Sequence, residues 1–552
     1  MNHPQKFVTS LLPILTLAWV LGTSIPAIAD QTWDGGGATD DWNDPANWTT
    51  AVPSAENANI NDGSTAVIDS AVPNITSFRL PLSSGSPFNF SGNISIVTGG
   101  SLTTTGSESY VGLRPSNVTS SLTVNGGSYT GTQLSVGEDR GSAGGDPGSK
   151  GSVTLSAGTI SLSSNLFLGR KNSGAGSLPT GSLTVSNGTL SVTGSGTLYV
   201  GEAGVGTATF TGGTTTAASG IRLGNSSGST GTATIGGTAQ VTSTALMYVG
   251  NAGVGSLTLQ DSGKLNTGVN GFVVGGSSTG NVLNLNGGTL TVGGSGLIVG
   301  FNSGGSGTVN VTAHTTTAHN VTGDVELGRT GANGNMTISG GTFGTTANGN
   351  SQILVGSAGT GTGNLTVSGG ILNANSGLYV ANGTGAGSMT IQGSAGQIAV
   401  KNDDFNLGFN GPATLNLQIG ASGITPIDVW AGTGVGVSIA ANVGSSAALN
   451  VALTAAPPTS PLVVINNATG SAVTGSLFTG LPEGALVSAI FNSTTYQWNL
   501  TYVHNSASGN TTDNIANDVA LILVAIPEPS TIVMTILGMS WFLMRGRRSH
   551  KN

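Results

Sequence analysis

The segment Leu246-Met-Tyr-Val-Gly-Asn-Ala-Gly-Val-Gly-Ser-Leu-Thr-Leu259 contains a pattern that recurs about a dozen times along the chain. Its clearest mark is a glycine that directly follows Val or Leu. This glycine occupies positions 112, 137, 169, 201, 224, 250, 275, 300, 328, 356 and 408, and Ala381 takes the corresponding position in one further repeat. We call these twelve positions the glycine slots. The twelve slots span 296 residues in eleven steps, so the mean period is about 27 residues. A period of this length indicates a solenoid, a propeller or another repeat array.

The residues before each glycine slot have the pattern of a short β-strand. The position before the slot is always Val or Leu, as in Val200 and Leu223, and the position two residues earlier is apolar in nearly every repeat. The position between them accepts tyrosine, serine, arginine or glutamate. Two apolar positions on either side of a tolerant one predict a strand with one buried face. The glycine then ends the strand, because glycine adopts positive φ without strain.

Each repeat contains two further strand patterns. One has the form apolar-Thr-apolar, as in Leu257-Thr-Leu259, with asparagine replacing threonine in three repeats. A weaker pattern follows, such as Gly-Gly-Thr-Leu at 287–290. Three short strands in this period suit one coil of a parallel β-solenoid better than a propeller blade of about 40–45 residues. We therefore predict an all-β chain with a parallel β-solenoid (β-helix) of about twelve coils. At about 4.8 Å per coil it would be roughly 55–60 Å long.

The composition indicates a weakly charged, hydroxyl-rich surface. Only 7% of the residues are charged, 92 are glycine, and none is cysteine. We expect no nucleic-acid partner, because phosphate binding needs clustered lysine and arginine. An exported protein without disulfides must gain its stability in another way, and the stacked hydrogen-bond ladders of a solenoid can supply it.

Residues 1–29 have the features of a secretory signal peptide. Lys6 provides a positive start, an apolar run follows, and the small residues Ala27 and Ala29 form a cleavage site. We expect the mature chain to begin at Asp30. A retained membrane anchor is the alternative, although the apolar run is short and interrupted by proline.

The segments on either side of the repeats are predicted to cap the solenoid. Residues 30–100 would form an N-terminal cap, 101–420 the repeats, and 421–526 a C-terminal β cap. Five tryptophans lie outside both the repeats and the terminal segments, namely Trp33, Trp42, Trp48, Trp430 and Trp498. Large rings suit the covering of an open solenoid core. An alternative function of the N-terminal cap is calcium binding by its clustered aspartates, Asp34, Asp40, Asp41 and Asp44.

The last 26 residues, 527–552, contain three parts in order. These are a Pro-Glu-Pro motif, an apolar run, and a basic cluster, carried by Pro527, Glu528, Pro529, Arg545, Arg547, Arg548 and Lys551. This segment resembles a PEP-CTERM sorting signal. The resemblance implies a transient anchor in the inner membrane, with the positive charges in the cytoplasm, until an exosortase-type enzyme processes the chain. The apolar run is short for a stable span of the membrane, being about 21 Å of helix.

The rest of the chain is similar to proteins with autotransporter-associated β-strand repeats. The similarity covers the tryptophan-rich start, the Val-Gly and Leu-Thr-Val repeats, and the endings Gly480-Leu-Pro-Glu-Gly-Ala485 and Asn517-Asp-Val-Ala-Leu521. This family implies an exported bacterial protein, often associated with extracellular matrix or biofilm. It implies no activity.

Parallel β-helices also host polysaccharide lyases and hydrolases, which need paired carboxylates or a cationic base in one groove. The acidic residues of the repeats are predicted to lie at turns and strand ends of different coils, as solubilising charges. Glu138, Asp139 and Arg140 form the best catalytic candidate. His314 and His319 are five residues apart, which places them on opposite faces of a strand, so we expect no shared metal. No cofactor is predicted.

Two outward columns remain as candidate binding surfaces. The first would be a ladder of threonines, Thr123, Thr154, Thr184, Thr209, Thr234 and Thr258. It resembles the flat faces of ice-binding solenoids, but threonine is also simply favourable on a solvent-facing strand. The second column contains Tyr110, Tyr199, Tyr248 and Tyr379, whose rings could stack on sugars. Because they come from non-adjacent coils, we expect scattered surface packing.

These features favour a non-enzymatic, exported structural or adhesive protein of the cell surface or extracellular matrix, with exopolysaccharide as a candidate partner. The alternative is a polysaccharide-active enzyme on the same fold. Removal of both terminal segments changes the formal net charge from −8 to about −12, since five basic residues and Glu528 are lost. Such an acidic rod should not adhere to anionic polymers through its overall charge.

Overall fold

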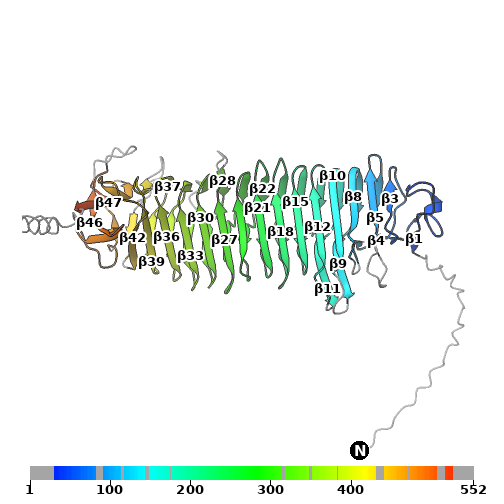
Figure 1. Cartoon of the computed structure of the whole chain (residues 1–552), viewed down its shortest axis with the longest axis horizontal. Coiled ribbons are helices and arrows are strands. Elements are labelled where there is room, and N and C mark those ends of the chain that lie inside the picture. Colours follow the sequence, from blue (N-terminus) through cyan, green and yellow to red (C-terminus); the bar gives the residue numbers. More distant parts are fainter. Residues whose placement is uncertain are drawn as a thin grey trace, which may run out of the picture.

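The predicted parallel β-solenoid is confirmed by a computed structural model of the chain (Figure 1). It describes residues 30–525 except 82–90, 114–116, 143–147, 175, 313–317, 347–350, 382, 409, 431–440, 445, 470–472, 476 and 507–515. The strands stack along the axis of a rod, with the N-terminal strands at one end and the C-terminal strands at the other. Within the described residues the helical structure is one short turn, η1 (Pro45–Asn47).

Each coil contributes one strand to each of three parallel faces. The first face ends at the glycine slots and is a 17-stranded sheet. Its strands are β1 (Gln31–Trp33), β2 (Asn57–Ile60), β4 (Ser77–Leu80), β7 (Ser109–Val111), β9 (Leu134–Ser142), β11 (Leu166–Gly174), β14 (Leu198–Val200), β17 (Ile221–Leu223), β20 (Met247–Val249), β23 (Phe272–Val274), β26 (Leu297–Val299), β29 (Val325–Arg329), β32 (Ile353–Ala358), β35 (Leu378–Val380), β38 (Phe405–Leu407), β41 (Ala441–Val443) and β44 (Thr474–Gly475).

The second face contains the apolar-Thr-apolar pattern. Its strands are β3 (Thr65–Ile68), β5 (Asn93–Val97), β8 (Ser120–Gly131), β10 (Lys150–Leu162), β12 (Thr180–Val185), β15 (Val205–Phe210), β18 (Thr230–Ile235), β21 (Val254–Leu259), β24 (Asn281–Leu285), β27 (Ser306–Val311), β30 (Asn333–Ile338), β33 (Thr362–Val367), β36 (Ala386–Gln392), β39 (Ala413–Ile419) and β42 (Ala447–Leu453).

The third face contains the weaker pattern, and the long strands β8 and β10 extend into it. Its other strands are β6 (Ser101–Thr103), β13 (Thr189–Val192), β16 (Thr214–Ala217), β19 (Gln240–Ser243), β22 (Lys264–Thr267), β25 (Thr289–Val292), β28 (Ala318–Val321), β31 (Thr342–Thr345), β34 (Gly370–Ala374), β37 (Gly396–Lys401), β40 (Ile427–Trp430) and β43 (Leu462–Ala468).

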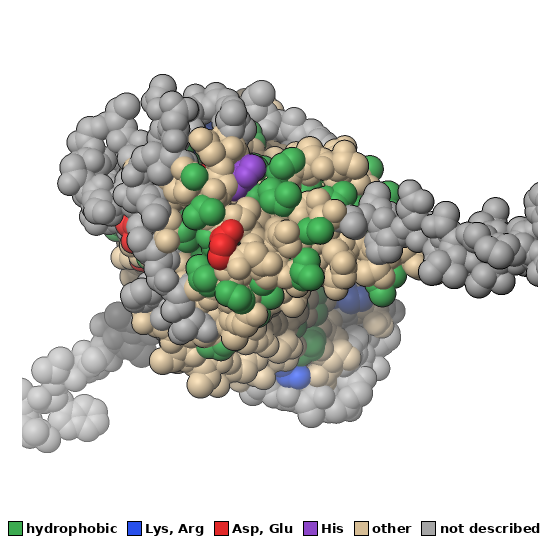
Figure 2. Space-filling model, turned by 90° about the vertical axis from the view of Figure 1, so that its left-hand side faces the viewer, with side chains coloured by type: hydrophobic (Ala, Val, Ile, Leu, Met, Phe, Trp, Pro, Cys, Tyr) green, Lys and Arg blue, Asp and Glu red, His purple; other side chains and the backbone are tan. Residues whose placement is uncertain are grey.

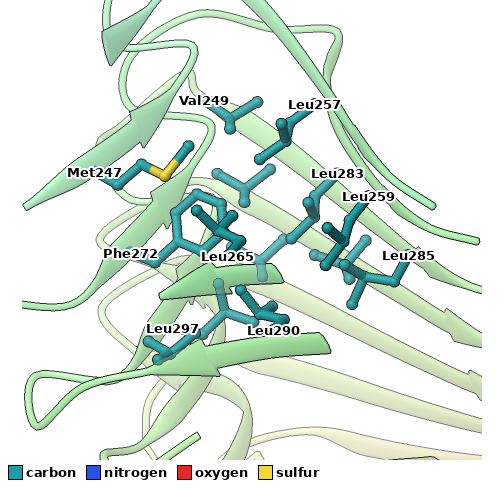
Figure 3. Packing of buried hydrophobic residues seen from close by; sticks show 14 of the residues in the cluster. Met247, Val249, Leu257, Leu259, Leu265, Phe272, Leu283, Leu285, Leu290 and Leu297 are labelled. Carbon is teal, nitrogen blue, oxygen red and sulfur yellow. The ribbon is translucent and has the colours of Figure 1, made fainter. Parts of the chain in front are cut away.

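The core consists of inward columns from all three faces, stacked from coil to coil. Figure 3 shows part of it, where Met247, Phe272 and Leu297 of the first face point toward leucines of the other two. Every residue directly before a glycine slot is fully buried, as predicted. In-register stacking places like side chains above one another, so each coil buries its apolar face only when its neighbours are present.

The glycine slots combine positive φ with very close packing of successive coils. Gly201 has φ +73°, and a Cβ there would lie 2.1 Å from the backbone oxygen of Thr230 on the next coil. Ala381, which fills the one slot without glycine, has φ +57° and faces Gly387 on the second face. At a slot such as Gly201, close packing therefore disfavours a side chain for a steric reason, in addition to the conformational one that the pattern predicted.

The structure has about fourteen turns, so the prediction of twelve was wrong. One extra turn uses β4, β5 and β6, and there Pro81 occupies the position of the glycine. Another uses β41, β42 and β43, with Gly444 in the slot, but it follows the preceding slot by much more than one mean period. Parallel pairing therefore begins before residue 101 and continues past residue 420.

The N-terminal end is covered by a short segment rich in tryptophan. Residues 40–42 bond along the edge of β3, where Trp42 N–H donates to Val67 O (2.8 Å). The rings of Trp33 and Trp42 both pack edge-on against Trp48, and all three are buried. This segment thereby pairs an edge that would otherwise be open to other strands.

At the C-terminal end, three antiparallel strands close the rod. They are β45 (Leu486–Phe491), β46 (Thr494–His504) and β47 (Asp518–Ala525), and β47 pairs antiparallel with β43. Trp498 is fully buried beneath this sheet. Figure 2 shows hydrophobic side chains on the outer surface of this end. The exposed ones in this region are Leu477, Leu486, Ile490, Val503 and Val524.

His319 occupies a core position of the third face, in register with Phe343 on the next coil. Its Nδ1 accepts a hydrogen bond from the backbone N–H of Leu290 (3.3 Å), whereas its Nε2 is buried without a partner. Burial lowers the pKa of His319 to about 4. The imidazole is therefore neutral at pH 7 and acts as an apolar core residue that also completes the strand ladder. His314 lies outside the described residues.

Candidate functional site

The outward position of the first face carries a continuous strip of aromatic and charged side chains. Strand register places these side chains one above another on the six consecutive strands from β7 to β20. We call this column the first-face strip, and its members are Tyr110, Ser135, Phe167, Tyr199, Arg222 and Tyr248. The tyrosines come from non-adjacent coils, as expected, and Tyr379 lies apart on β35. The other three nevertheless belong to one column, because Ser135, Phe167 and Arg222 occupy the coils between them.

Neighbouring aromatic rings of the first-face strip contact one another or the guanidinium group of Arg222. The rings of Phe167 and Tyr199 stack with centroids 4.9 Å apart and an interplanar angle of 13°. The guanidinium carbon of Arg222 lies 5.8 Å from the Tyr199 ring and 5.7 Å from the Tyr248 ring. Such cation–π contacts fix an arginine side chain whose rotamers would otherwise be free.

An acidic cluster lies beside the first half of the strip, at the base of the projection that β9 and β11 form in Figure 1. Glu108 accepts hydrogen bonds from Tyr110 Oη (2.8 Å), Arg140 Nη2 (3.0 Å) and Arg170 Nη1 (2.8 Å). Ser135 donates a fourth. Burial alone would raise the pKa of Glu108, but these donors outweigh it and hold that pKa below its ordinary value.

Glu138 is the second carboxylate of the cluster and is fully buried. Arg140 and Asn172 donate to its Oε1, and its Oε2 has no hydrogen bond, with Arg170 Nη1 at 3.6 Å. Burial, followed by the nearby charge of Glu108, raises the pKa of Glu138. Asp139 is fully buried as well. The prediction that these acidic residues are solubilising surface charges was therefore wrong.

Two nearby carboxylates with opposite pKa shifts resemble the arrangement that acid–base catalysis requires. In this cluster, however, both carboxylates are engaged by arginine, and Glu138 is shielded from solvent. Breaking such buried ion pairs is costly, because it leaves an uncompensated charge. The geometry is that of a structural clamp, in which ion pairs hold neighbouring coils together beside the first-face strip.

Glu202 also lies near this cluster, and burial raises its pKa despite the nearby charge of Arg170. The other acidic side chains that the structure describes in the repeats make local contacts. Asp324 accepts a hydrogen bond from the backbone of Gln352, Glu326 pairs with Arg329 at 3.5 Å, and Asp403 accepts from Gln352. The N-terminal aspartates Asp34, Asp41 and Asp44 each accept a backbone N–H two residues further on. In the part of the chain that the structure describes, no three potential metal-ligating side chains form a group.

The second face carries the predicted threonine ladder, and it is longer than the six threonines. Register aligns fourteen outward positions, Ser95, Thr123, Thr154, Thr184, Thr209, Thr234, Thr258, Asn284, Asn310, Thr337, Thr366, Thr390, Asn416 and Asn450. Neighbouring amides bond to each other, as in Asn310 Nδ2 to Asn284 Oδ1 (2.9 Å). The result is an uncharged polar face along most of the rod.

The predicted signal residues Ala27 and Ala29 lie outside the described residues. So do Pro527, Glu528, Pro529 and the basic residues of the tail. Among the residues that are described, no helix has the length and apolar character needed to cross a membrane.

Glu138, Asp139, Arg140 and the tyrosines are recognisable from the sequence, whereas the structure identifies Glu108, Phe167, Arg170 and Arg222 as members of the strip and the cluster. Aligning the middle residue of each first-face strand would have found Phe167 and Arg222, because that column is defined by the glycine slots. Comparison with known proteins adds no assignment, since no family model matches the chain and no curated protein matches it.

Proposed function

We propose that the protein is an exported, non-enzymatic β-solenoid that serves as a structural or adhesive component of the cell surface or extracellular matrix. The observation that carries this proposal is the long stack of coils with an uncharged hydroxyl and amide face, together with an acidic cluster of Glu108 and Glu138 that is neutralised by arginine. Such a rod offers an extended surface without an open catalytic centre. Exopolysaccharide is the proposed partner, because hydroxyls and amides can hydrogen-bond sugar hydroxyls and aromatic rings can stack on sugar rings.

The C-terminal end supports a membrane-anchored precursor. Strand β47 ends at Ala525, two residues before the proposed PEP-CTERM signal. The end of the rod from which the chain leaves also carries exposed hydrophobic side chains, of which Ile490 is 67% and Val503 60% exposed (Figure 2). A hydrophobic end next to a membrane anchor is favourable, because exposed apolar patches mark contact surfaces.

The second candidate function is a polysaccharide-active enzyme. Glu108 and Glu138 favour it, since they lie together beside the first-face strip and their pKa values shift in opposite directions. For catalysis, one of them would have to leave its arginine partners and reach the substrate.

One experiment separates the two candidates. The protein is incubated with the exopolysaccharide of the producing cells, and co-sedimentation and release of soluble sugar are followed together. We expect binding without sugar release. Release that is lost in a Glu138→Gln variant would instead establish the enzyme, and absence of binding would contradict the adhesive function.

Deletion of residues 527–552 should remove the protein from the inner-membrane fraction, because the precursor is then no longer anchored. The reason is that this segment contains the apolar run and basic cluster proposed to anchor the precursor. The measurement is immunoblotting of inner-membrane, cell-surface and medium fractions. A matched control replaces only Pro527, Glu528 and Pro529 by alanine, which should leave an anchored but unprocessed chain. Unchanged localisation of the deletion variant would refute the sorting proposal.

A further inference from the structure

We propose that Arg222, held between Tyr199 and Tyr248, binds the carboxylate of a uronic-acid unit in a linear acidic polysaccharide that lies along the first-face strip. This inference rests on the proposed function and narrows it, because it names the class of polysaccharide and the residue that recognises it.

Arg222 differs from the other arginines that the structure describes. Arg79, Arg140, Arg170 and Arg329 each form an ion pair with a carboxylate. Arg222 has no such partner within the described part of the chain, and its Nε is buried without a hydrogen bond. A half-buried cation without a counter-charge is unfavourable unless something supplies that charge, so the site is suited to an anionic ligand.

The two tyrosine rings orient the guanidinium group for this task. They lie 5.8 Å and 5.7 Å from its carbon, on the preceding and the following coil, and so restrict the side chain from both sides along the rod axis. A planar guanidinium held in this way can donate two parallel hydrogen bonds to one carboxylate. The tyrosine hydroxyls can both donate and accept, which is what the hydroxyl groups of a sugar require.

The direction of the strip matches that of a linear polymer. Phe167, Tyr199, Arg222 and Tyr248 lie on four successive coils, about 4.8 Å apart along the rod. On the N-terminal side, the acidic cluster does not compete for Arg222, because Glu108 and Glu138 are bound to Arg140 and Arg170. On the adjoining corner of the Arg222 and Tyr248 coils, Asn225 and Asn251 bond to each other (3.1 Å) and add neutral polar groups.

The same coils carry a shallow hollow at the turn between the first and second faces. It is lined by residues from three successive coils, among them Ser229, Ala252 and Ser278. Apart from Val254, its lining residues are small or carry hydroxyl groups, and none is charged. A hollow with mostly hydroxyl-bearing, uncharged lining suits the neutral part of a sugar chain.

The test uses polygalacturonate as the acidic polymer and its fully methyl-esterified form as the neutral control with the same backbone. Binding of the intact protein to each is measured by affinity electrophoresis at low and high salt. We expect preference for the free acid, decreasing with salt. Arg222→Gln should weaken binding to the free acid by about tenfold or more, as expected for loss of a hydrogen-bonded charge. The affinity of this variant for the ester should stay within about twofold of the wild-type affinity, which is a small difference in binding free energy.

Arg329→Gln is the matched control. Arg329 belongs to the same face and lies 5.4 Å from the ring of Phe301, but it is paired with Glu326. Its replacement should not change the preference for the acid. Tyr248→Phe keeps the ring and removes the hydroxyl. It should therefore slightly weaken binding to both polymers, while the circular dichroism spectrum stays unchanged.

Four results would overturn the inference. Equal binding of acid and ester, or equal losses in Arg222→Gln and Arg329→Gln, would exclude Arg222 as the recognition residue while leaving the proposed adhesive function intact. Absence of binding to polygalacturonate, combined with binding to the cells' own exopolysaccharide, would exclude the uronate class alone. Absence of binding to every polysaccharide would contradict both the inference and the proposed function.

Discussion

Replacement of Gly201 by alanine should lower the free energy of unfolding by about 3 kcal/mol or more, which is at the high end for single substitutions. Two effects add. Alanine at φ +73° costs about 1–2 kcal/mol. In addition, its Cβ would lie 2.1 Å from the backbone oxygen of Thr230, so the next coil must shift. Urea unfolding followed by far-ultraviolet circular dichroism measures the loss.

Gly228→Ala is the control for this prediction. Gly228 has a similar φ of +78°, but nothing lies within 4 Å of the position of its missing Cβ. Its replacement should therefore cost only the conformational part, about 1–2 kcal/mol. Equal losses in the two variants would show that the close approach of successive coils is not what requires glycine at the slots.

Acidification from pH 7 to pH 4 should destabilise the wild-type protein by about 3 kcal/mol more than a His319→Leu variant. The folded-state pKa of His319 is about 4, below its ordinary value of 6.5. Between these values the unfolded chain binds a proton and the folded chain does not, so protonation favours unfolding. The stabilising contribution is complete above pH 6.5 and is lost as the pH falls toward 4.

The measurement is the difference in unfolding free energy between the two proteins at several pH values, because protonation of the carboxylates affects both alike and cancels. At neutral pH, His319→Leu should cost about 1 kcal/mol through loss of the acceptor for the Leu290 N–H. Phe343→Leu, in the neighbouring position of the ladder, is the control and should shift stability equally at every pH. Parallel pH profiles of wild type and His319→Leu would disprove the buried, neutral histidine.

The architecture could be predicted in detail because it depends on short-range patterns. Val200 and Leu223 are identified as core residues by their position before a glycine, and both are fully buried. The count of coils failed where the pattern was interrupted, at Pro81 and before Gly444. A coil can keep its inward residues and its pairing without the glycine or the usual spacing, since the neighbouring coils hold it in place.

The first-face strip could be predicted only in part. The tyrosines can be recognised as one column in the sequence. Phe167 and Arg222 belong to the same column, but a search for tyrosine alone does not find them. The burial of Glu138 could not be predicted, because a Glu-Asp-Arg sequence normally indicates a turn in solvent. Here β9 and β11 continue past their glycine slots, and Arg170 of β11 lies beside Glu138 of β9.

The sequence by itself determined the coil: its three strands, its inward columns, its glycine turns and its parallel stacking. These follow from residues a few positions apart, for which strand alternation and the φ preference of glycine are sufficient. Only the tertiary structure decided which outward side chains meet. Arg170 bonds to Glu108, 62 residues earlier, and Arg222 lies between tyrosines of two other coils. The glycine slots align the strands of successive coils, but which side chains pack against one another across coils depends on their three-dimensional arrangement, which no local pattern encodes.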